Sequence, residues 1–397
     1  MDTTLVLDDV PFAIGFVLDH LRKREPTYAD ALPENLVAFT AKDITGGKAY
    51  FSRIIRIAFT WNSSSITPES IILKVPGVQT YALTGDAETD AATDEYLEYA
   101  HSNENDVYKY LWNAAEKFNT TLKIPKIYFA SGYSKSHTEG VIIMDDLSVT
   151  GTTLKLIPGF NNGQVESSID ELAKIHALVW KNGGVTVFDG CPGQDEFVQE
   201  MKRTANALRT ISPNSVGLLM DEIDGLFTPT VYHYAVYSTN KFGFPPTLVH
   251  SDLWSANMLF KNNTNGTPTD DLLSIIDWQS GHAGNPFADI GRLLAVNTSA
   301  VYRRRETNRL LKRYYDVVSA EMDGKPPFTE EQMHYAYAAG MGYVAQFLGF
   351  GVPVYYNMSA IVGTDENKGK LQEELLDRTK CFFEDTLQAF KEYSIEK

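Results

Sequence analysis

The chain has 397 residues, and its 35 Lys and Arg against 51 Asp and Glu give a net charge of −16 at pH 7. This balance argues against a nucleic-acid-binding protein, which would need clustered Lys and Arg to neutralise phosphates. A composition of 43% apolar and 22% charged residues is typical of a globular protein with a large core, and the length predicts two or three domains, or two lobes around a cleft.

The cysteines and the apolar segments indicate a cytoplasmic protein. Cys191 and Cys381 are too few for a disulfide framework or a Cys-based zinc site. The first residues lack the basic and apolar regions of a secretory signal. Residues 335–356 contain no charged side chain and are long enough to span a bilayer, but their glycines and Pro353 favour a buried helix that ends in a turn. No membrane span is expected.

The apolar pattern changes from strands to helices along the chain. Residues rich in Ile, Val, Phe and Thr, separated by polar turns, predict an antiparallel sheet, with one long helix inserted. The expected strands are 37–44, 50–60, 70–75, 126–132 and 140–144, and the expected helix is 88–118.

Beyond residue 150 the helical period dominates. The expected helices are 165–180, 286–296, 301–321, 329–350 and 372–393, and a strand with a hairpin interrupts them at 247–249, 258–260 and 272–276. The sequence therefore predicts an α+β fold with a small antiparallel-sheet lobe, residues 1–145, and a larger, mainly helical lobe, residues 146–397.

The most informative segment runs from His250 to Asn257 and includes Asp252; Asp277 follows twenty residues later. Phosphoryl transfer needs a carboxylate beside the attacking hydroxyl and oxygen ligands for Mg²⁺. A hairpin of that length can return Asp277 to the same place. Asp252 is therefore the candidate catalytic base, and Asn257 and Asp277 are the candidate metal ligands. His250 is grouped with Asp252 but is expected to orient the loop through hydrogen bonds. A bare His-x-Asp could also be a pair that satisfies itself in a core.

Lys74 is the only charge in an apolar strand, where a buried ammonium group is costly without an anionic partner. Glu104, thirty residues later, lies in a helical stretch and could pair with Lys74 and so place it on the nucleotide phosphates. Two other interpretations stay open at this point. Lys74 could lie on a sheet edge, and Glu104 could lie on a solvated helix face.

Two further segments are candidates for nucleotide binding. Gly46 and Gly47 lie between two strands, where glycine permits a close approach of the backbone to phosphates, although a Gly-Gly pair is also an ordinary hairpin turn. Met144 ends a buried strand before Asp145 and Asp146. Backbone groups near Met144 could pair with an adenine edge, or the segment could simply be a strand end and a turn.

Taken together, these residues resemble a known family. Lys74, Glu104, Met144-Asp145-Asp146-Leu147, the segment 250–257 and Ile276-Asp277-Trp278-Gln279 follow the order seen in ecdysteroid-kinase-like and CHK-kinase-like proteins, most similarly in uncharacterised nematode and insect members. These proteins belong with choline kinases and aminoglycoside phosphotransferases to the protein-kinase-like fold. The resemblance spans about residues 35–390. It implies ATP and Mg²⁺ as cofactors and places Asp289 as a buttress of the catalytic loop.

The resemblance implies an ATP-dependent kinase that phosphorylates a small-molecule alcohol, which could be steroid-like, choline-like or a glycoside. The chain departs from the family pattern at Ser251, where members usually have Gly, and in its glycine-poor phosphate loop. These departures motivate an alternative, a catalytically impaired kinase-fold protein that binds a nucleotide or a lipid-like ligand. A metal-dependent hydrolase is a weaker third interpretation. Because positive φ is uncommon for a non-glycine residue, Ser251 is expected to have negative φ.

Overall fold

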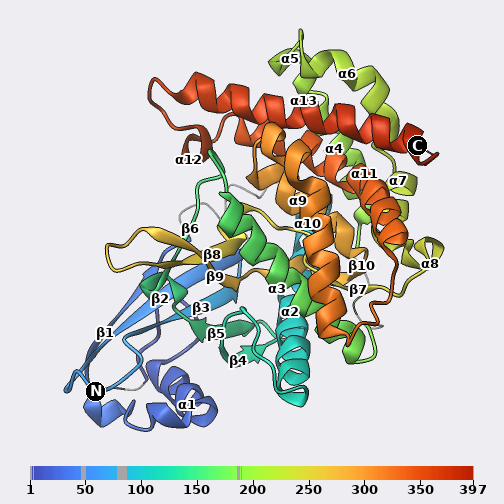
Figure 1. The fold of residues 1–397 in the computed structure, drawn as a ribbon. Helices are drawn as coiled ribbons and strands as arrows, with labels where there is room; N and C mark the ends of the chain where they lie inside the picture. Colours follow the sequence, from blue (N-terminus) through green and yellow to red (C-terminus); the bar gives the residue numbers. More distant parts are fainter. Residues whose placement is uncertain are drawn as a thin grey trace. The chain divides into compact units, whose positions relative to one another are not determined.

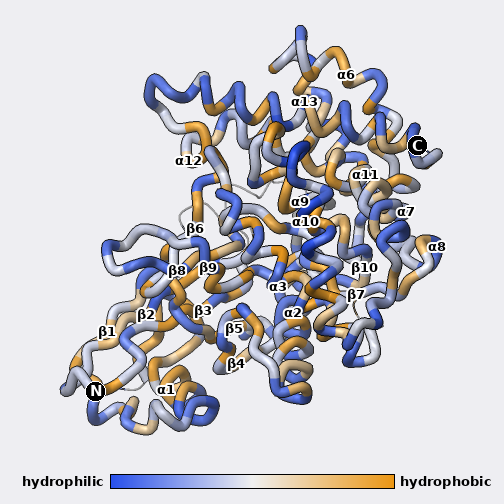
Figure 2. Tube along the Cα trace, viewed as in Figure 1, coloured by the Kyte–Doolittle hydropathy of each residue, from blue (hydrophilic) through white to orange (hydrophobic). Residues whose placement is uncertain are grey.

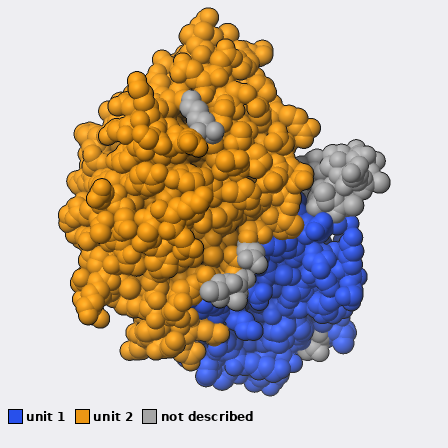
Figure 3. Space-filling view, turned by 90° about the vertical axis from the view of Figure 1, so that its right-hand side faces the viewer, with its two compact units in different colours: residues 1–110, 124–150, 277–279 blue, residues 111–123, 151–276, 280–397 orange. Residues whose placement is uncertain are grey.

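The computed structural model describes residues 2, 4–45, 51–77, 87–185, 188 and 190–396. The chain divides into two compact units (Figure 3). Unit 1 contains residues 1–110, 124–150 and 277–279, and unit 2 contains residues 111–123, 151–276 and 280–397. The candidate loop residues Gly46 and Gly47 lie outside the described residues.

Unit 1 is built on an antiparallel sheet of five strands in the order β1-β2-β3-β5-β4 (Figure 1). The strands are β1 (Leu36–Asp43), β2 (Ser52–Trp61), β3 (Ser70–Pro76), β4 (Ile127–Ser131) and β5 (Val141–Asp145). β3 is an inner strand, in which Lys74 lies opposite Ile54 of β2 and Ile142 of β5. The sheet-edge interpretation of Lys74 is therefore excluded.

Two helices accompany this sheet. α1 (Ile14–Arg24) buries Ile14, Val17, Leu18 and Leu21 in a core that it shares with the strands. These residues recur at helical spacing, so one face of α1 is apolar and can cover the sheet. α2 (Ala87–Lys117) is much longer, and its residues up to position 110 belong to unit 1.

Unit 2 is mainly helical. Its helices are α3 (Asn162–Lys181), α4 (Gln194–Ala205), α5 (Leu208–Ile211), α6 (Val216–Ile223), α7 (Pro229–Tyr237), α8 (Thr239–Phe242), α9 (Pro286–Asn297), α10 (Ala300–Glu321), α11 (Glu330–Tyr355), α12 (Ser359–Val362) and α13 (Lys368–Glu392). α11 packs against α4, α7, α9 and α13. In Figure 2 the turns of α13 alternate between hydrophobic and hydrophilic residues, as expected for a helix with one packed face.

The apolar stretch predicted to be a buried helix lies in α11, and Pro353 stands inside the last turn of that helix. Close packing against α9 depends on Gly340, because a Cβ there would lie 3.1 Å from the Ala288 backbone. Among the residues that the structure describes, no helix is long and apolar enough to cross a membrane.

Short strands interrupt the helices of unit 2 near the predicted site. They are β6 (Gly151–Thr153), β7 (Thr247–Val249), β8 (Met258–Asn262), β9 (Pro268–Ile275) and β10 (His282–Gly284), which form the sheets β6-β8-β9 and β10-β7. β7 precedes the predicted catalytic loop, and the β8–β9 hairpin separates that loop from Asp277. The strand and the hairpin expected at 247–276 are therefore present.

Candidate active site

In unit 1, one buried ammonium group lies between two carboxylates. Lys74 Nζ is 2.6 Å from Glu104 Oε2 and 2.5 Å from Asp277 Oδ1. Lys74 and Glu104 are buried, whereas the Asp277 side chain keeps 26% of its surface exposed. Glu104 is thus not on a solvated helix face, and the predicted ion pair is present.

Each charge in this cluster favours the ionised form of its partner of opposite sign. Burial opposes the charge on Lys74, but the carboxylates of Asp277 and Glu104 outweigh this effect and raise the pKa of Lys74. Burial raises the pKa of Glu104, and the ammonium group of Lys74 opposes that rise. With both carboxylates ionised, the cluster carries a net negative charge, which can attract a further cation.

The backbone of Asp277 is held in an uncommon conformation. Its φ is 66°, in the left-handed region. The N–H of Asp277 donates to the hydroxyl oxygen of Tyr108 at 3.2 Å. Tyr108 lies on α2, one turn after Glu104, so the same helix contacts both the ammonium group and the Asp277 backbone.

In unit 2, the loop after β7 places Asp252 and Asn257 together. The amide nitrogen of Asn257 donates to the backbone oxygen of Asp252 at 2.9 Å and to Asp252 Oδ2 at 3.2 Å. Both partners are acceptors, so the amide must present its nitrogen to them and its oxygen elsewhere. That oxygen is the atom that a metal ion would need.

The other oxygen of the Asp252 carboxylate meets a buried cation. Arg292 Nη2 on α9 donates to Asp252 Oδ1 at 2.9 Å. Arg292 is 3% exposed, and the Asp252 side chain is 31% exposed. Burial opposes the charge on Arg292, but the Asp252 carboxylate outweighs this and raises the pKa of Arg292. Asp252 is therefore fixed at both oxygens and remains reachable from solvent.

α9 also holds the backbone of the loop. Asp289 accepts hydrogen bonds from the N–H groups of His250 at 2.6 Å and Ser251 at 2.8 Å. Asn297, at the end of the helix, donates to the backbone oxygen of Leu253 at 2.9 Å. Burial raises the pKa of Asp289, and these amide hydrogen bonds oppose that rise. The buttress role that the resemblance implied for Asp289 has this geometric basis.

The expectation of negative φ at Ser251 is wrong. Its φ is 70°, in the left-handed region that glycine adopts more easily. The physical reason is that neighbours fix this backbone from several sides: Asp289 accepts its N–H, and the Tyr343 hydroxyl donates to its carbonyl oxygen. Ser251 Oγ also lies 3.2 Å from His282 Nδ1. Such fixed contacts can hold a residue in a conformation that costs free energy.

His250 orients this segment. The N–H of Asp252 donates to His250 Nδ1 at 3.2 Å, so the ring proton is on Nε2, which donates to the backbone oxygen of Ile276 at 2.9 Å. The N–H of Ile276 in turn donates to the backbone oxygen of Asn257 at 2.9 Å. His250 is fully buried. These contacts give it a positioning role and no free nitrogen for proton transfer.

The structure thus brings the predicted residues together in two sets. Lys74, Glu104 and Asp277 meet in unit 1, and the segment from His250 to Asn257 forms one loop in unit 2. The peptide bond between residues 276 and 277 joins the two units in the sequence.

The Met144 backbone is occupied by the sheet. Met144 lies opposite Ile72 of β3 and Ile127 of β4. The next residue, Asp145, donates its N–H to the backbone oxygen of Lys126 at 3.1 Å. Backbone groups for an adenine edge would therefore have to follow the strand, in the turn that begins at Asp146.

Sequence reasoning missed Arg292 and Tyr343. Arg292 follows Asp289 by three positions, so the helical period alone would have placed it on the same face of α9. Tyr343 contacts Ser251 across 92 positions, and nothing in the local sequence signals that contact.

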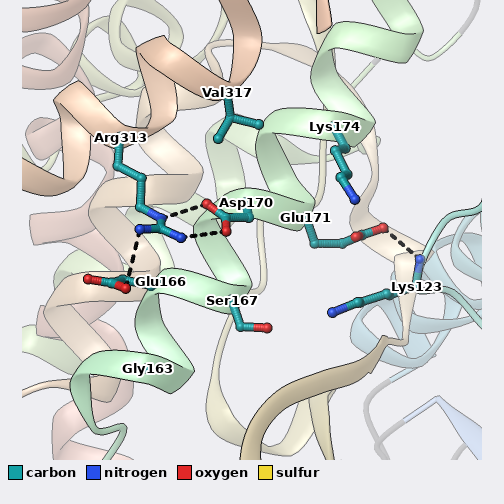
Figure 4. A pocket seen from close by; sticks show the side chains of 9 residues that line it. All are labelled: Lys123, Gly163, Glu166, Ser167, Asp170, Glu171, Lys174, Arg313 and Val317. Atoms are coloured by element: carbon teal, nitrogen blue, oxygen red, sulfur yellow. Dashed lines mark hydrogen bonds and ion pairs between the residues drawn. The ribbon is translucent and has the colours of Figure 1, made fainter. Parts of the chain in front are cut away.

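A separate cavity of about 320 Å³ lies on unit 2 (Figure 4). Its lining comes from α3, α10 and Lys123 and includes none of the predicted site residues. Arg313 reaches across it to Asp170, at 2.6 and 2.7 Å, and to Glu166, at 3.2 Å. Arg313, Asp170 and Glu166 in this lining therefore already have partners of opposite sign. Among the described residues, no three His, Cys, Asp or Glu side chains lie together as a metal site.

The chain is similar to one protein family and to two proteins of Caenorhabditis elegans. The model of the family DUF1679, described as "Uncharacterized oxidoreductase dhs-27", matches residues 38–394. The "Uncharacterized kinase-like protein D1044.1" of Caenorhabditis elegans is 24% identical over 366 residues, which cover 87% of this chain and 92% of that protein. The "Uncharacterized oxidoreductase dhs-27" of the same organism is 25% identical over 214 residues, which cover 50% of this chain.

The match to the dhs-27 protein covers only 25% of that protein's length, so the word oxidoreductase describes a protein that is mostly unmatched here. Among solved structures, the choline kinase of Cryptosporidium parvum superposes with a TM-score of 0.51 at 12% identity, and the match covers 95% of each chain. That likeness shows a shared fold.

Proposed function

Since the chain belongs to the DUF1679 family and has the fold of a choline kinase, we propose that it is an ATP-dependent phosphotransferase that phosphorylates a hydroxyl group of a small molecule. The observation that carries this proposal is the loop from His250 to Asn257. It holds one carboxylate, Asp252, fixed at both oxygens yet partly exposed. A shared fold does not establish an activity, so the proposal depends on this loop and on the Lys74 cluster.

The proposed reaction assigns one step to Asp252. The acceptor hydroxyl oxygen bonds to the γ-phosphorus of ATP while the bond from that phosphorus to the bridging oxygen breaks, and ADP leaves. The hydroxyl proton passes to the Asp252 carboxylate, whose Oδ2 has only a 3.2 Å contact with the neutral Asn257 amide. His250 and Asp289 keep the loop in place during this step.

Lys74 would hold the nucleotide phosphates, and Glu104 would keep Lys74 charged and oriented. The donor set also fits Mg²⁺, because the Asn257 amide oxygen is turned away from the acceptors that its nitrogen contacts, and Asp277 supplies a partly exposed carboxylate. Asn257 and Asp277 would be its ligands. When bound, the ion would neutralise phosphate charge. Gly46, Gly47 and the segment after Met144 remain proposed nucleotide contacts.

The test is an ATP-turnover screen over steroids, choline and glycosides, with mass detection of a phosphorylated product. The control is Asp252→Asn, which keeps the side-chain size and removes the proton acceptor. We expect this variant to bind Mg-ATP nearly normally and to lose turnover by several orders of magnitude, about what loss of a positioned base costs. Full turnover by the variant would show that Asp252 is not the base.

One observation favours the second candidate function, an impaired kinase-fold protein that binds a nucleotide or a lipid-like ligand. Ser251 has φ of 70° at a position where the resemblance implies glycine, so the loop stores strain beside Asp252. Against it, the hydrogen bonds of Asp289 and Tyr343 hold the loop in place. Mg-ATP binding without turnover of any acceptor, together with faster turnover in Ser251→Gly, would favour this second function.

A further inference from the structure

Arg292 is the α9 side chain that contacts the Asp252 carboxylate itself. Asp289 lies three residues earlier on the same helix and holds the amides of residues 250 and 251. Because residues three apart share a helix face, one face of α9 presents an anion to the loop backbone and a cation to the loop carboxylate.

The surroundings of Arg292 leave it little freedom. It is 3% exposed, and its guanidinium carbon lies 4.4 Å from the centre of the Phe347 ring. The ring face favours the cation and fixes its plane. The guanidinium group of Arg292 is held in place, whereas the Asp252 side chain is partly exposed. The ion pair between them therefore determines where Oδ1 of Asp252 lies.

The two oxygens of Asp252 therefore have different tasks. Oδ1 faces a full positive charge at 2.9 Å, and Oδ2 faces only the Asn257 amide at 3.2 Å. A proton arriving from a hydroxyl would bind the oxygen that is farther from the cation. The ion pair thus directs the hydroxyl to Oδ2.

We propose that Arg292 is a positioning residue for phosphoryl transfer, which holds Asp252 by Oδ1 so that Oδ2 receives the acceptor proton. This inference rests on the proposed function. Arg292 stays protonated throughout and acts through Asp252. Its removal would let the Asp252 side chain rotate, and a misplacement of about 1 Å can cost on the order of 100-fold in rate.

A purely structural role is the competing explanation, and the chain supplies a matched control. Arg303 on α10 is also buried at 4% exposure, pairs with Asp385 Oδ2 at 2.7 Å and lies 5.0 Å from the centre of the Phe382 ring. Like Arg292, it pairs with a carboxylate and lies against a phenylalanine ring; its partner Asp385 also pairs with Arg304 and is not in the catalytic loop. Loss of either arginine should therefore destabilise the fold.

The experiment compares Arg292→Met, Arg292→Lys and Arg303→Met in the full chain, using the acceptor found in the screen. We expect Arg292→Met to lower kcat about 100-fold. The KM for Mg-ATP should change less than about threefold, since the substitution removes no contact that binds Mg-ATP equally in the ground state and the transition state. The kcat of Arg292→Lys should be at least about tenfold higher than that of Arg292→Met, because lysine restores the positive charge although it lacks the planar guanidinium group. Arg303→Met should also lower the melting midpoint and leave kcat unchanged.

Equal loss of kcat in Arg292→Met and Arg303→Met, or no recovery in Arg292→Lys, would overturn the positioning role while leaving the proposed function intact. In the Asp252→Asn background, Arg292→Met should cause no further loss of turnover, and a full additional loss would also overturn it. If the wild type phosphorylates no acceptor, or if Asp252→Asn remains fully active, the proposed function fails, and the role of Arg292 fails with it.

Discussion

Replacing Ser251 by Gly tests how the catalytic loop tolerates a left-handed serine. Its φ of 70° costs about 1–2 kcal/mol for a residue with a Cβ, and glycine would remove that cost. The same change adds about 0.4–1 kcal/mol of unfolded-chain entropy. It also removes the Oγ contact to His282, which is 3.2 Å long and is worth about 0.5–1.5 kcal/mol. We expect the free energy of unfolding to stay within about 1 kcal/mol of the parent's.

Ser251→Ala separates the strain from the lost hydroxyl. Alanine keeps the left-handed cost and loses the same contact, so Ser251→Gly should be more stable than Ser251→Ala by about 1 kcal/mol. Ser255 is the matched control, because it is also buried, lies in the same loop and is not among the positive-φ residues. There the order should reverse, with glycine less stable than alanine by about 0.5–1 kcal/mol.

The assay is urea denaturation of the four variants, with turnover measured in parallel. Alanine more stable than glycine at both serines would refute the left-handed strain at position 251. For turnover, we expect Ser251→Gly to stay within a few-fold of the parent, since neither residue supplies a reacting group. A large increase would instead support the impaired-kinase alternative.

Three further predictions follow from the site and its surroundings. Asp277→Ala should weaken Mg-ATP binding on the order of tenfold or more, since it removes the only formal charge among the proposed metal ligands; unchanged calorimetric affinity would place the ion elsewhere. Burial lowers the pKa of His176 to about 3, so its contribution to stability is complete above about pH 6.5 and is lost as the pH falls toward 3. His176→Asn should therefore flatten the dependence of unfolding free energy on pH in this range, by up to about 1.4 kcal/mol per pH unit, and an unchanged slope in urea titrations would count against this assignment. Because Arg292 neutralises Asp252, choline should be phosphorylated no faster than its uncharged isostere with a tert-butyl group in place of the trimethylammonium; a strong preference for choline in the product assay would show that an anionic subsite exists.

The sequence predicted the fold well where a periodic pattern coincides with a buried element. The sheet of β1 to β5 and the helices α3, α9, α10, α11 and α13 lie near their expected positions, because each presents apolar residues at a regular period. The predicted protein-kinase-like architecture is confirmed by the likeness to choline kinase. α1, the helices α4 to α8 and α12, and the three-residue strands β6 and β10 were not among the expected elements. Strands of three residues have almost no periodicity, and pairing with distant strands forms them.

For the site, the sequence indicated those residues whose charge or polarity differs from that of their neighbours in the sequence. Lys74 is a lone charge in an apolar strand, and its pair with Glu104 follows from the cost of burying that charge. The partners that orient Asp252 were less visible, because Arg292 looks like any helical arginine until the fold brings it to the loop. The φ of Ser251 could not be predicted from the local sequence, since contacts from Asp289 and Tyr343 fix it.

Both polar segments of the proposed site contain a non-glycine residue with left-handed φ, Ser251 at 70° and Asp277 at 66°. In each case a side chain from a helix holds the strained backbone: Asp289 accepts the N–H of Ser251, and Tyr108 accepts the N–H of Asp277. Strain persists only where surrounding contacts impose it, and it is commonest where side-chain direction matters for function. Asp277 is itself a proposed site carboxylate, and Ser251 directly precedes another, Asp252. We therefore expect the contacts to Asp289 and Tyr108 to orient the side chains of Asp252 and Asp277. A left-handed serine at position 251 is therefore compatible with an active loop, because the contacts to Asp289 and Tyr343 fix its backbone.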